Sequence, residues 1–173
     1  MVKTAAACLL ALLLAACASY SGRGLVAGQS TQEDVLRIMG QPAMTWADAD
    51  GSRQLAFVRG PVGTQTFMVR IAPDGTLRSI DKALEPEVFQ TVTAGLDEDQ
   101  VLRLLGPPTP RWTAYFQPRD ELAWQWRYCD EWNSPARFTV LFDASRKTVR
   151  STFSLRDEEI GQCGHDGGCW CGR

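Results

Sequence analysis

The sequence contains a single histidine, His165, and no excess of basic charge. Its 18 Lys and Arg residues are balanced by 20 Asp and Glu residues, which gives a formal net charge of -2. Binding along a nucleic-acid backbone depends on clustered positive charge, so no nucleic acid is expected as a partner. The nucleophile elbow Gly-x-Ser-x-Gly, the glycine-rich phosphate loop and the zinc motif His-Glu-x-x-His are all missing. We therefore expect neither an enzyme nor a cofactor.

Beyond residue 16 the chain also lacks a long hydrophobic run. Residues 5–16 are apolar apart from Cys8, and Lys3 precedes them, which is the layout of an export signal. A helix of that length rises only ~18 Å against a bilayer core of ~30 Å, so it is too short to remain as a membrane span. We predict that residues 1–16 form a signal peptide and that no second membrane segment follows.

The end of this signal, Leu14-Ala15-Ala16-Cys17, resembles the cleavage site of bacterial lipoproteins. The resemblance implies that Cys17 is lipidated and becomes the first residue of the mature chain. Several acyl chains anchor a protein stably, and residues 17–27 would then form the anchor and a short tether. No aspartate follows the cysteine, which in such proteins implies sorting to the periplasmic face of the outer membrane. The alternative is a plain secretory signal, with Cys17 an ordinary thiol.

An internal repeat occupies most of the remaining chain. Residues 31–42 match residues 97–108 at a constant offset of 66, and Trp46 and Trp112 keep the same spacing. After small insertions, residues 55–57, 67–71 and 77–79 match residues 122–124, 138–142 and 149–151. We therefore predict two tandem units, at residues 28–90 and 91–155, followed by a tail rich in Cys and Gly at residues 156–173.

Each unit begins with a predicted helix of about eight residues. Thr31 or Ser30 in the first unit and Asp97 in the second are suited to cap its start. Gly40 and Gly106 are expected to end it in the left-handed conformation, and a proline follows two residues later. Three strands with alternating apolar residues come next in each unit, connected as an antiparallel meander. The predicted fold class is α+β.

The alternation also predicts which side chains face the core. In the second unit one face is expected to hold Leu122, Trp124, Trp126, Tyr128, Phe138, Val140, Phe142, Val149, Ser151 and Phe153. The aromatic residues alternate with Leu122, which favours core packing over a binding platform.

The combination of a lipoprotein cysteine, a Val-Leu-Arg-x-x-Gly-x-Pro helix end and a strand meander resembles the SmpA/OmlA, or BamE-like, family of outer-membrane lipoproteins. The tandem repeat is similar to the β-lactamase-inhibitor-protein fold, which implies that the strands of both units lie side by side in one larger sheet. The resemblance implies a non-catalytic protein-binding module, in outer-membrane assembly or envelope integrity. Its protein partner would be a β-barrel assembly component. The alternative is an inhibitor-like module that binds a periplasmic enzyme.

The sheet face opposite the core is expected to be free for such a partner. Arginine is enriched at interface cores, whereas Lys and Glu are depleted there. The face is predicted to include Ala56, Met68 and Thr152, and its candidate contact residues are Arg70, Arg78, Gln125, Arg127, Leu141 and Arg150, with Trp132 in a loop nearby. The simpler interpretation of this face is a solvated surface.

Four cysteines remain after Cys17, namely Cys129, Cys163, Cys169 and Cys171. An even number in an oxidising compartment favours disulfides. A bond between Cys169 and Cys171 would close a strained ring, so one of these two is expected to reach Cys129 and the other Cys163. The weaker alternative is a zinc site formed by Cys163, His165, Cys169 and Cys171.

Overall fold

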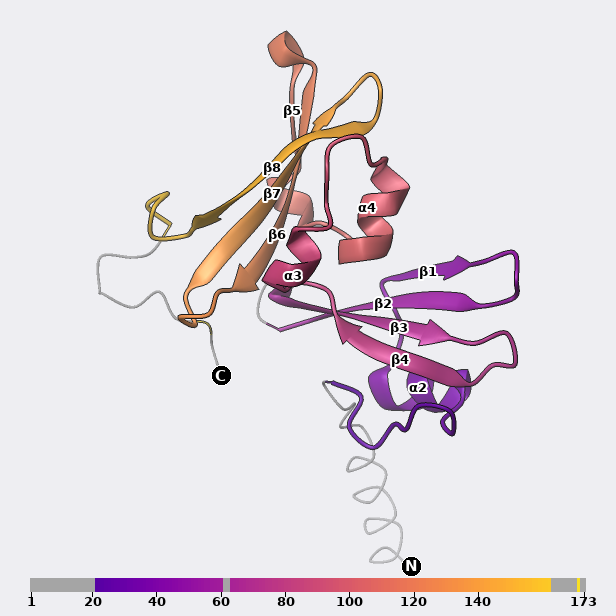
Figure 1. The fold of residues 1–173 in the computed structure, drawn as a ribbon. Helices are drawn as coiled ribbons and strands as arrows, with labels where there is room; N and C mark the ends of the chain where they lie inside the picture. The colour runs from indigo at the N-terminus through magenta and orange to yellow at the C-terminus, as the bar shows by residue number, and fades with distance from the viewer. Residues whose placement is uncertain (1–20, 61–62, 163–170, 172–173) are drawn as a thin grey trace, which may run out of the picture.

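The computed structural model describes residues 21–60, 63–162 and residue 171, which form two helix-and-sheet units (Figure 1). The first unit comprises α2 (Gln32–Met39), β1 (Met44–Ala47), β2 (Arg53–Arg59), β3 (Gln65–Ile71) and β4 (Leu77–Lys82). The second comprises α3 (Pro86–Phe89), α4 (Glu98–Leu105), η3 (Pro110–Trp112), β5 (Ala114–Phe116), η4 (Gln117–Arg119), β6 (Glu121–Cys129), β7 (Pro135–Asp143) and β8 (Thr148–Arg156). The α+β class is confirmed. Within the described ranges no helix combines the length and apolarity needed to cross a membrane.

Each unit contains a separate four-stranded antiparallel sheet, in the orders β1-β2-β3-β4 and β5-β6-β7-β8. The prediction of one larger sheet is therefore wrong, and so is the prediction of three strands per unit. One face of the first sheet packs against α4 of the second unit, and the two sheets do not pair edge to edge. The additional strands β1 and β5 have only 4 and 3 residues, which is too short for an alternating pattern to be evident.

The structure confirms the two helices and their caps. Thr31 caps α2 together with Asp34, and Asp97 caps α4 together with Gln100, in each case as a reciprocal capping box. Both helices end at a glycine with positive φ, as predicted. However, Gly40 has a ψ of -153° and Gly106 a ψ of -170°, so neither adopts the predicted left-handed helical conformation.

Matching backbone details show that the two units are structural repeats. The residue that caps each helix forms a bridge at the start of the last strand, Thr31 with Thr76 just before β4 and Asp97 with Thr148 of β8. A bulge interrupts the pairing of the last two strands at equivalent places, beside Ile71 and beside Phe142.

Each unit has its own hydrophobic core. In the first, α2 packs Val35 and Met39 against one face of the sheet. In the second, Val101 and Leu105 of α4 join the aromatic residues of β6 and β7, and Phe89 of α3 packs between Tyr128 and Phe138. The prediction that Trp124, Trp126 and Tyr128 belong to the core is confirmed.

The bulge in β8 changes which residues face this core. Val149 pairs with Phe142, but Ser151 pairs with Leu141 and Phe153 with Thr139, so the extra residue is Arg150. A single extra residue moves every later side chain to the opposite face. Phe153 therefore lies on the face away from the core and Thr152 lies on the core side, the reverse of the prediction.

Candidate protein-binding surface

Each sheet has an outer face, defined here as the face opposite its own packed helix, α2 or α4. α4 of the second unit lies against the outer face of the first sheet and covers the part around Ala56 and Met68 (Figure 1). Ala56 and Met68 on this face are buried, and a side chain at Gly106 would come within 2.8 Å of Thr66. The prediction that Ala56 and Met68 are free to contact a partner is therefore wrong. The helix α4 packs against the sheets of both units.

Polar contacts hold α4 in this position. Arg103 forms ion pairs with Asp99 (2.9 Å) and with Asp48 of the first unit (2.8 Å), and it lies over the ring of Trp46. The Trp46 indole donates a hydrogen bond to Asp99 (2.9 Å), and Gln54 donates to the Arg103 carbonyl. The hydrogen bonds from Arg103 and then Trp46 lower the pKa of Asp99. Trp46 thus contacts the second unit from β1.

The outer face of the second sheet, in contrast, displays apolar side chains. Strand register places Phe116 of β5, Leu141 of β7, and Phe153 and Leu155 of β8 on this face. Phe116, Phe153 and Leu155 are 52%, 41% and 38% exposed, and Leu141 is half-buried. η3 covers part of this face, because Trp112 lies against Arg137. The apolar side chains of Phe116, Phe153 and Leu155 remain exposed and available for contact.

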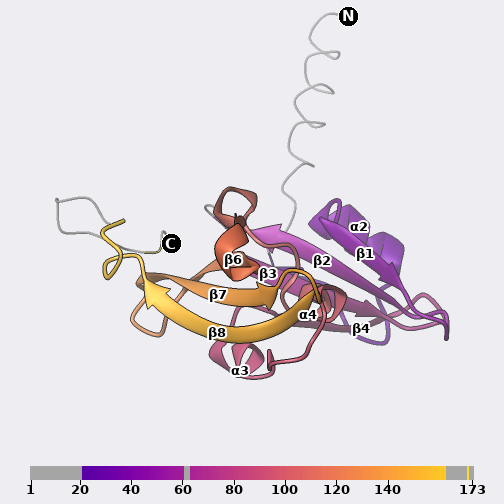
Figure 2. The same ribbon diagram turned by 90° about the horizontal axis from the view of Figure 1, so that it is seen from above.

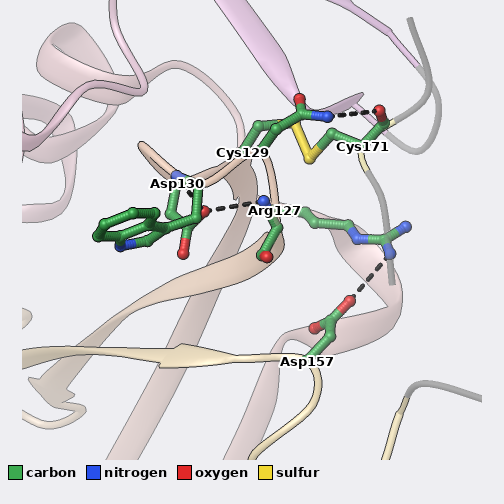
Figure 3. The surroundings of a disulfide bond; sticks show 8 residues. Arg127, Cys129, Asp130, Asp157 and Cys171 are labelled. Atoms are coloured by element: carbon green, nitrogen blue, oxygen red, sulfur yellow. Dashed lines mark hydrogen bonds and ion pairs between the residues drawn. A yellow bond between two sulfur atoms is a disulfide. The ribbon is translucent and has the colours of Figure 1, made fainter. Parts of the chain in front are cut away.

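A buried ionic cluster supports one end of this outer face. Asp157 is 2% exposed and forms ion pairs with Arg127 (2.9 Å) and Arg137 (2.8 Å), which are paired neighbours on β6 and β7. Trp112 stacks on the Arg137 guanidinium at 3.9 Å. Figure 3 shows Arg127 reaching toward Asp157 close to the Cys129 disulfide. The main role of Arg127 is therefore to stabilise this face through its ion pair with Asp157.

At the other end of this outer face, arginine side chains pair with carboxylates that are largely buried. Arg150 pairs with Glu121 (3.6 Å) and Asp143 (3.4 Å), and Arg146 also pairs with Asp143. The carboxylate side chains are 10% and 15% exposed, whereas that of Arg150 is 40% exposed. A partner would therefore meet mainly the arginines here.

The predicted contact residues do not form one surface. Gln125, Arg127, Leu141 and Arg150 lie together on the outer face of the second sheet. Trp132 is 65% exposed in the loop between β6 and β7. Arg70 and Arg78 are exposed but belong to the first sheet, where Arg70 pairs with Asp81.

Sequence reasoning missed several residues of the outer face. Phe153 and Leu155 were missed because the bulge could not be foreseen, and Phe116 because β5 is so short. The cluster of Arg137 and Asp157 joins positions that are 20 residues apart, and no local pattern links them.

A disulfide joins Cys129 to Cys171 and attaches the tail to the end of β6 (Figure 3). This confirms the prediction that Cys129 bonds one of the two last cysteines. The bond removes Cys171 from the alternative zinc site, and the other three residues proposed for that site, Cys163, His165 and Cys169, lie outside the described residues, as does Cys17. Among the residues that are described, no group of His, Cys, Asp and Glu is arranged to hold a metal ion. Comparisons with family models, with curated proteins and with solved structures find no match to this chain.

Proposed function

We propose that this chain is a lipoprotein of the outer membrane, anchored through Cys17 on the periplasmic side, and that it acts as a non-catalytic protein-binding module. Its role would be in outer-membrane assembly or envelope integrity. The anchor rests on the Leu14-Ala15-Ala16-Cys17 signal, and the role rests on the resemblance to SmpA/OmlA lipoproteins.

One observation carries the binding role, namely the difference between the two outer faces. The first is partly covered by α4, whereas the second leaves Phe116, Phe153 and Leu155 exposed beside arginines. Exposed apolar residues with adjacent arginines are typical of protein interfaces.

The test is photo-crosslinking in intact envelopes. A photo-crosslinking residue replaces Leu141 on the second outer face, and the control carries it in place of the exposed Glu33 on α2. We expect protein adducts from position 141 only, and their loss when Phe116→Asp and Leu155→Asp are added. Equal labelling from both positions, or none from position 141, would contradict the proposal. The intact mass of the mature chain tests acylation of Cys17 independently.

The alternative function, binding to a periplasmic enzyme as an inhibitor does, was suggested by the tandem repeat, whose resemblance implied one larger sheet. The two units are repeats, but their sheets are separate. Identification of the position 141 adduct as a soluble hydrolase would nevertheless select this alternative over a barrel-assembly component.

A further inference from the structure

β8 forms an edge of the second sheet, since it pairs with β7 on one side and no described strand pairs with its other side (Figure 2). Both ends of this edge are capped. At the start, the Val149 amide donates to the Leu96 carbonyl, and its carbonyl accepts from Gly95. At the end, the Arg156 amide donates to the Glu159 carboxylate, and its carbonyl accepts from the Glu159 amide. Between the caps lie the bulged residue Arg150 and a window of five residues, 151–155.

The caps also show which backbone groups point outward. The N–H and C=O groups of Arg156 form their hydrogen bonds on the side of β8 that faces away from β7. The next amide, that of Asp157, points the other way and donates to the Pro135 carbonyl of β7. Backbone groups alternate in direction along a strand of an antiparallel pair. Thr152 and Ser154 therefore direct their N–H and C=O groups outward, and no partner for these groups exists within the described part of the chain.

The window is uncharged, which distinguishes it from the equivalent edge of the first unit. β4 pairs Asp81 with Met68 and Lys82 with Phe67, and the corresponding β8 pairs place Phe153 and Ser154 at these positions. Charged side chains protect an exposed edge from pairing with another strand. The first unit carries charges at these positions, whereas the second carries charge only beside the window, in Arg150 and Arg156.

A pocket of about 410 Å³ opens beside the window. Tyr128, Ala136 and Leu155 supply part of its wall. Arg156 and Asp130, which pair with each other, also line it, and the carboxylates of Glu131 and Glu159 add two further negative charges. An apolar wall with carboxylates matches the aliphatic stem and charged head of a lysine or arginine. Ser154 lines the same pocket, so a residue paired with Ser154 would direct its side chain toward it.

We propose that β8 binds an extended segment of a partner protein as an added antiparallel strand, a proposal that rests on the binding role proposed above. The segment has the pattern apolar–basic–apolar. Its basic residue pairs with Ser154 and enters the pocket, and its apolar residues lie beside Leu155 and Phe153 on the outer face. Main-chain hydrogen bonds to Thr152 and Ser154 supply affinity, and the pocket supplies specificity.

The test measures binding of a labelled peptide, acetyl-Thr-Val-Lys-Val-Thr-Val-Thr-amide, to the full chain by fluorescence anisotropy. Two control peptides carry Glu in place of Lys, or an N-methyl group on the Lys amide. We expect saturable binding of the first peptide and a loss of roughly tenfold or more in affinity for each control, because each removes a charge contact or a main-chain bond.

Two substitutions at Ser154 and one double variant test where the peptide binds. Ser154→Pro removes an outward N–H and leaves the bonds to β7 intact, which an edge strand tolerates. We expect this variant to lose the peptide, while Ser154→Ala keeps it. Glu131→Gln with Glu159→Gln should weaken binding of the Lys peptide and leave a norleucine version unchanged. Thermal unfolding of every variant verifies that the fold is retained.

The proposal is wrong if the peptide does not bind, or if Ser154→Pro binds it as well as Ser154→Ala does. It is equally wrong if the free chain forms a dimer that Ser154→Pro dissociates, because a second copy would then occupy the edge. Repeating the position 141 crosslinking in Ser154→Pro separates the two proposals. Adducts that persist there without peptide binding would leave the binding role standing and reject the strand addition.

Discussion

At the scale of single residues, Asp157 is the side chain on which the outer face of the second sheet most depends. Its carboxylate is almost fully buried and balances both Arg127 and Arg137. Removing one partner of a buried ionic group leaves the remaining charge without compensation, which is much more costly than losing an exposed pair. We predict that Asp157→Ala lowers the free energy of unfolding by about 3 kcal/mol, measured by urea denaturation.

The matched control is Asp81→Ala. Asp81 pairs with Arg70 at 3.7 Å, and both side chains are more than half exposed. Its loss should change the free energy of unfolding by less than about 1 kcal/mol. Similar effects from the two variants would show that the buried cluster has no special role.

The helix cap at Asp34 predicts a dependence on pH. The Thr31 amide, followed by Arg37 and the Thr31 hydroxyl, lowers the pKa of Asp34 from 3.8 to about 2. A carboxyl group with a lowered pKa stabilises the folded state fully above its unfolded pKa, and the contribution disappears as pH falls through the folded value. We predict that Asp34→Asn loses less stability than the wild type between about pH 5 and about pH 2, measured by urea denaturation.

Other aspartates with lowered pKa values, including Asp74 and Asp120, leave some acid sensitivity in this variant. The control is Glu33→Gln, which removes a carboxylate from the same exposed turn and keeps the bonds between Thr31 and Asp34. An unchanged acid profile in Asp34→Asn would exclude the cap as a source of the pH dependence.

At the scale of elements, the ends of α2 and α4 provide a matched pair. Gly40 and Gly106 share a backbone conformation that is almost restricted to glycine, with φ of 79° and 76°. A Cβ at Gly40 has no neighbour within 4 Å, whereas one at Gly106 meets the Thr66 methyl group at 2.8 Å. The two positions therefore differ in packing and not in backbone strain.

We predict that Gly40→Ala lowers the free energy of unfolding by about 1 to 2 kcal/mol through strain alone. Gly106→Ala should cost about 1 kcal/mol more, because it also overpacks the contact between the units. Adding Thr66→Ser, which removes the obstructing methyl group, should recover the excess in urea denaturation. No recovery would mean that α4 does not press on the first sheet as the structure shows.

The same elements show how far sequence reasoning extends. The helices, their caps at Thr31 and Asp97, and the aromatic stripe of β6 were predictable, because each depends on residues close together in the chain. Phe153 was placed on the wrong face because a bulge depends on strand pairing, which a single strand does not reveal. The contact between α4 and Met68 was not predicted, because nothing in the sequence indicates that the polar side of a short helix packs against a second sheet.

At the scale of the whole molecule, the shared helix α4 should make the two units unfold together. Ala56 is fully buried on the face that α4 covers, although the first unit's own core lies on the other side of the sheet. An arginine at this position would force α4 away and leave both cores intact. Ala47, which is exposed on the adjacent strand β1, offers the same substitution without that contact.

We predict that the wild type and Ala47→Arg unfold in one transition, with equal calorimetric and van't Hoff enthalpies, whereas Ala56→Arg unfolds in two. The separated first unit would expose Met68, so its transition should be the one at lower temperature. A single transition at the wild-type temperature in Ala56→Arg would show that the units are joined elsewhere. Two transitions in the wild type would show that α4 contributes little to the stability of the first unit.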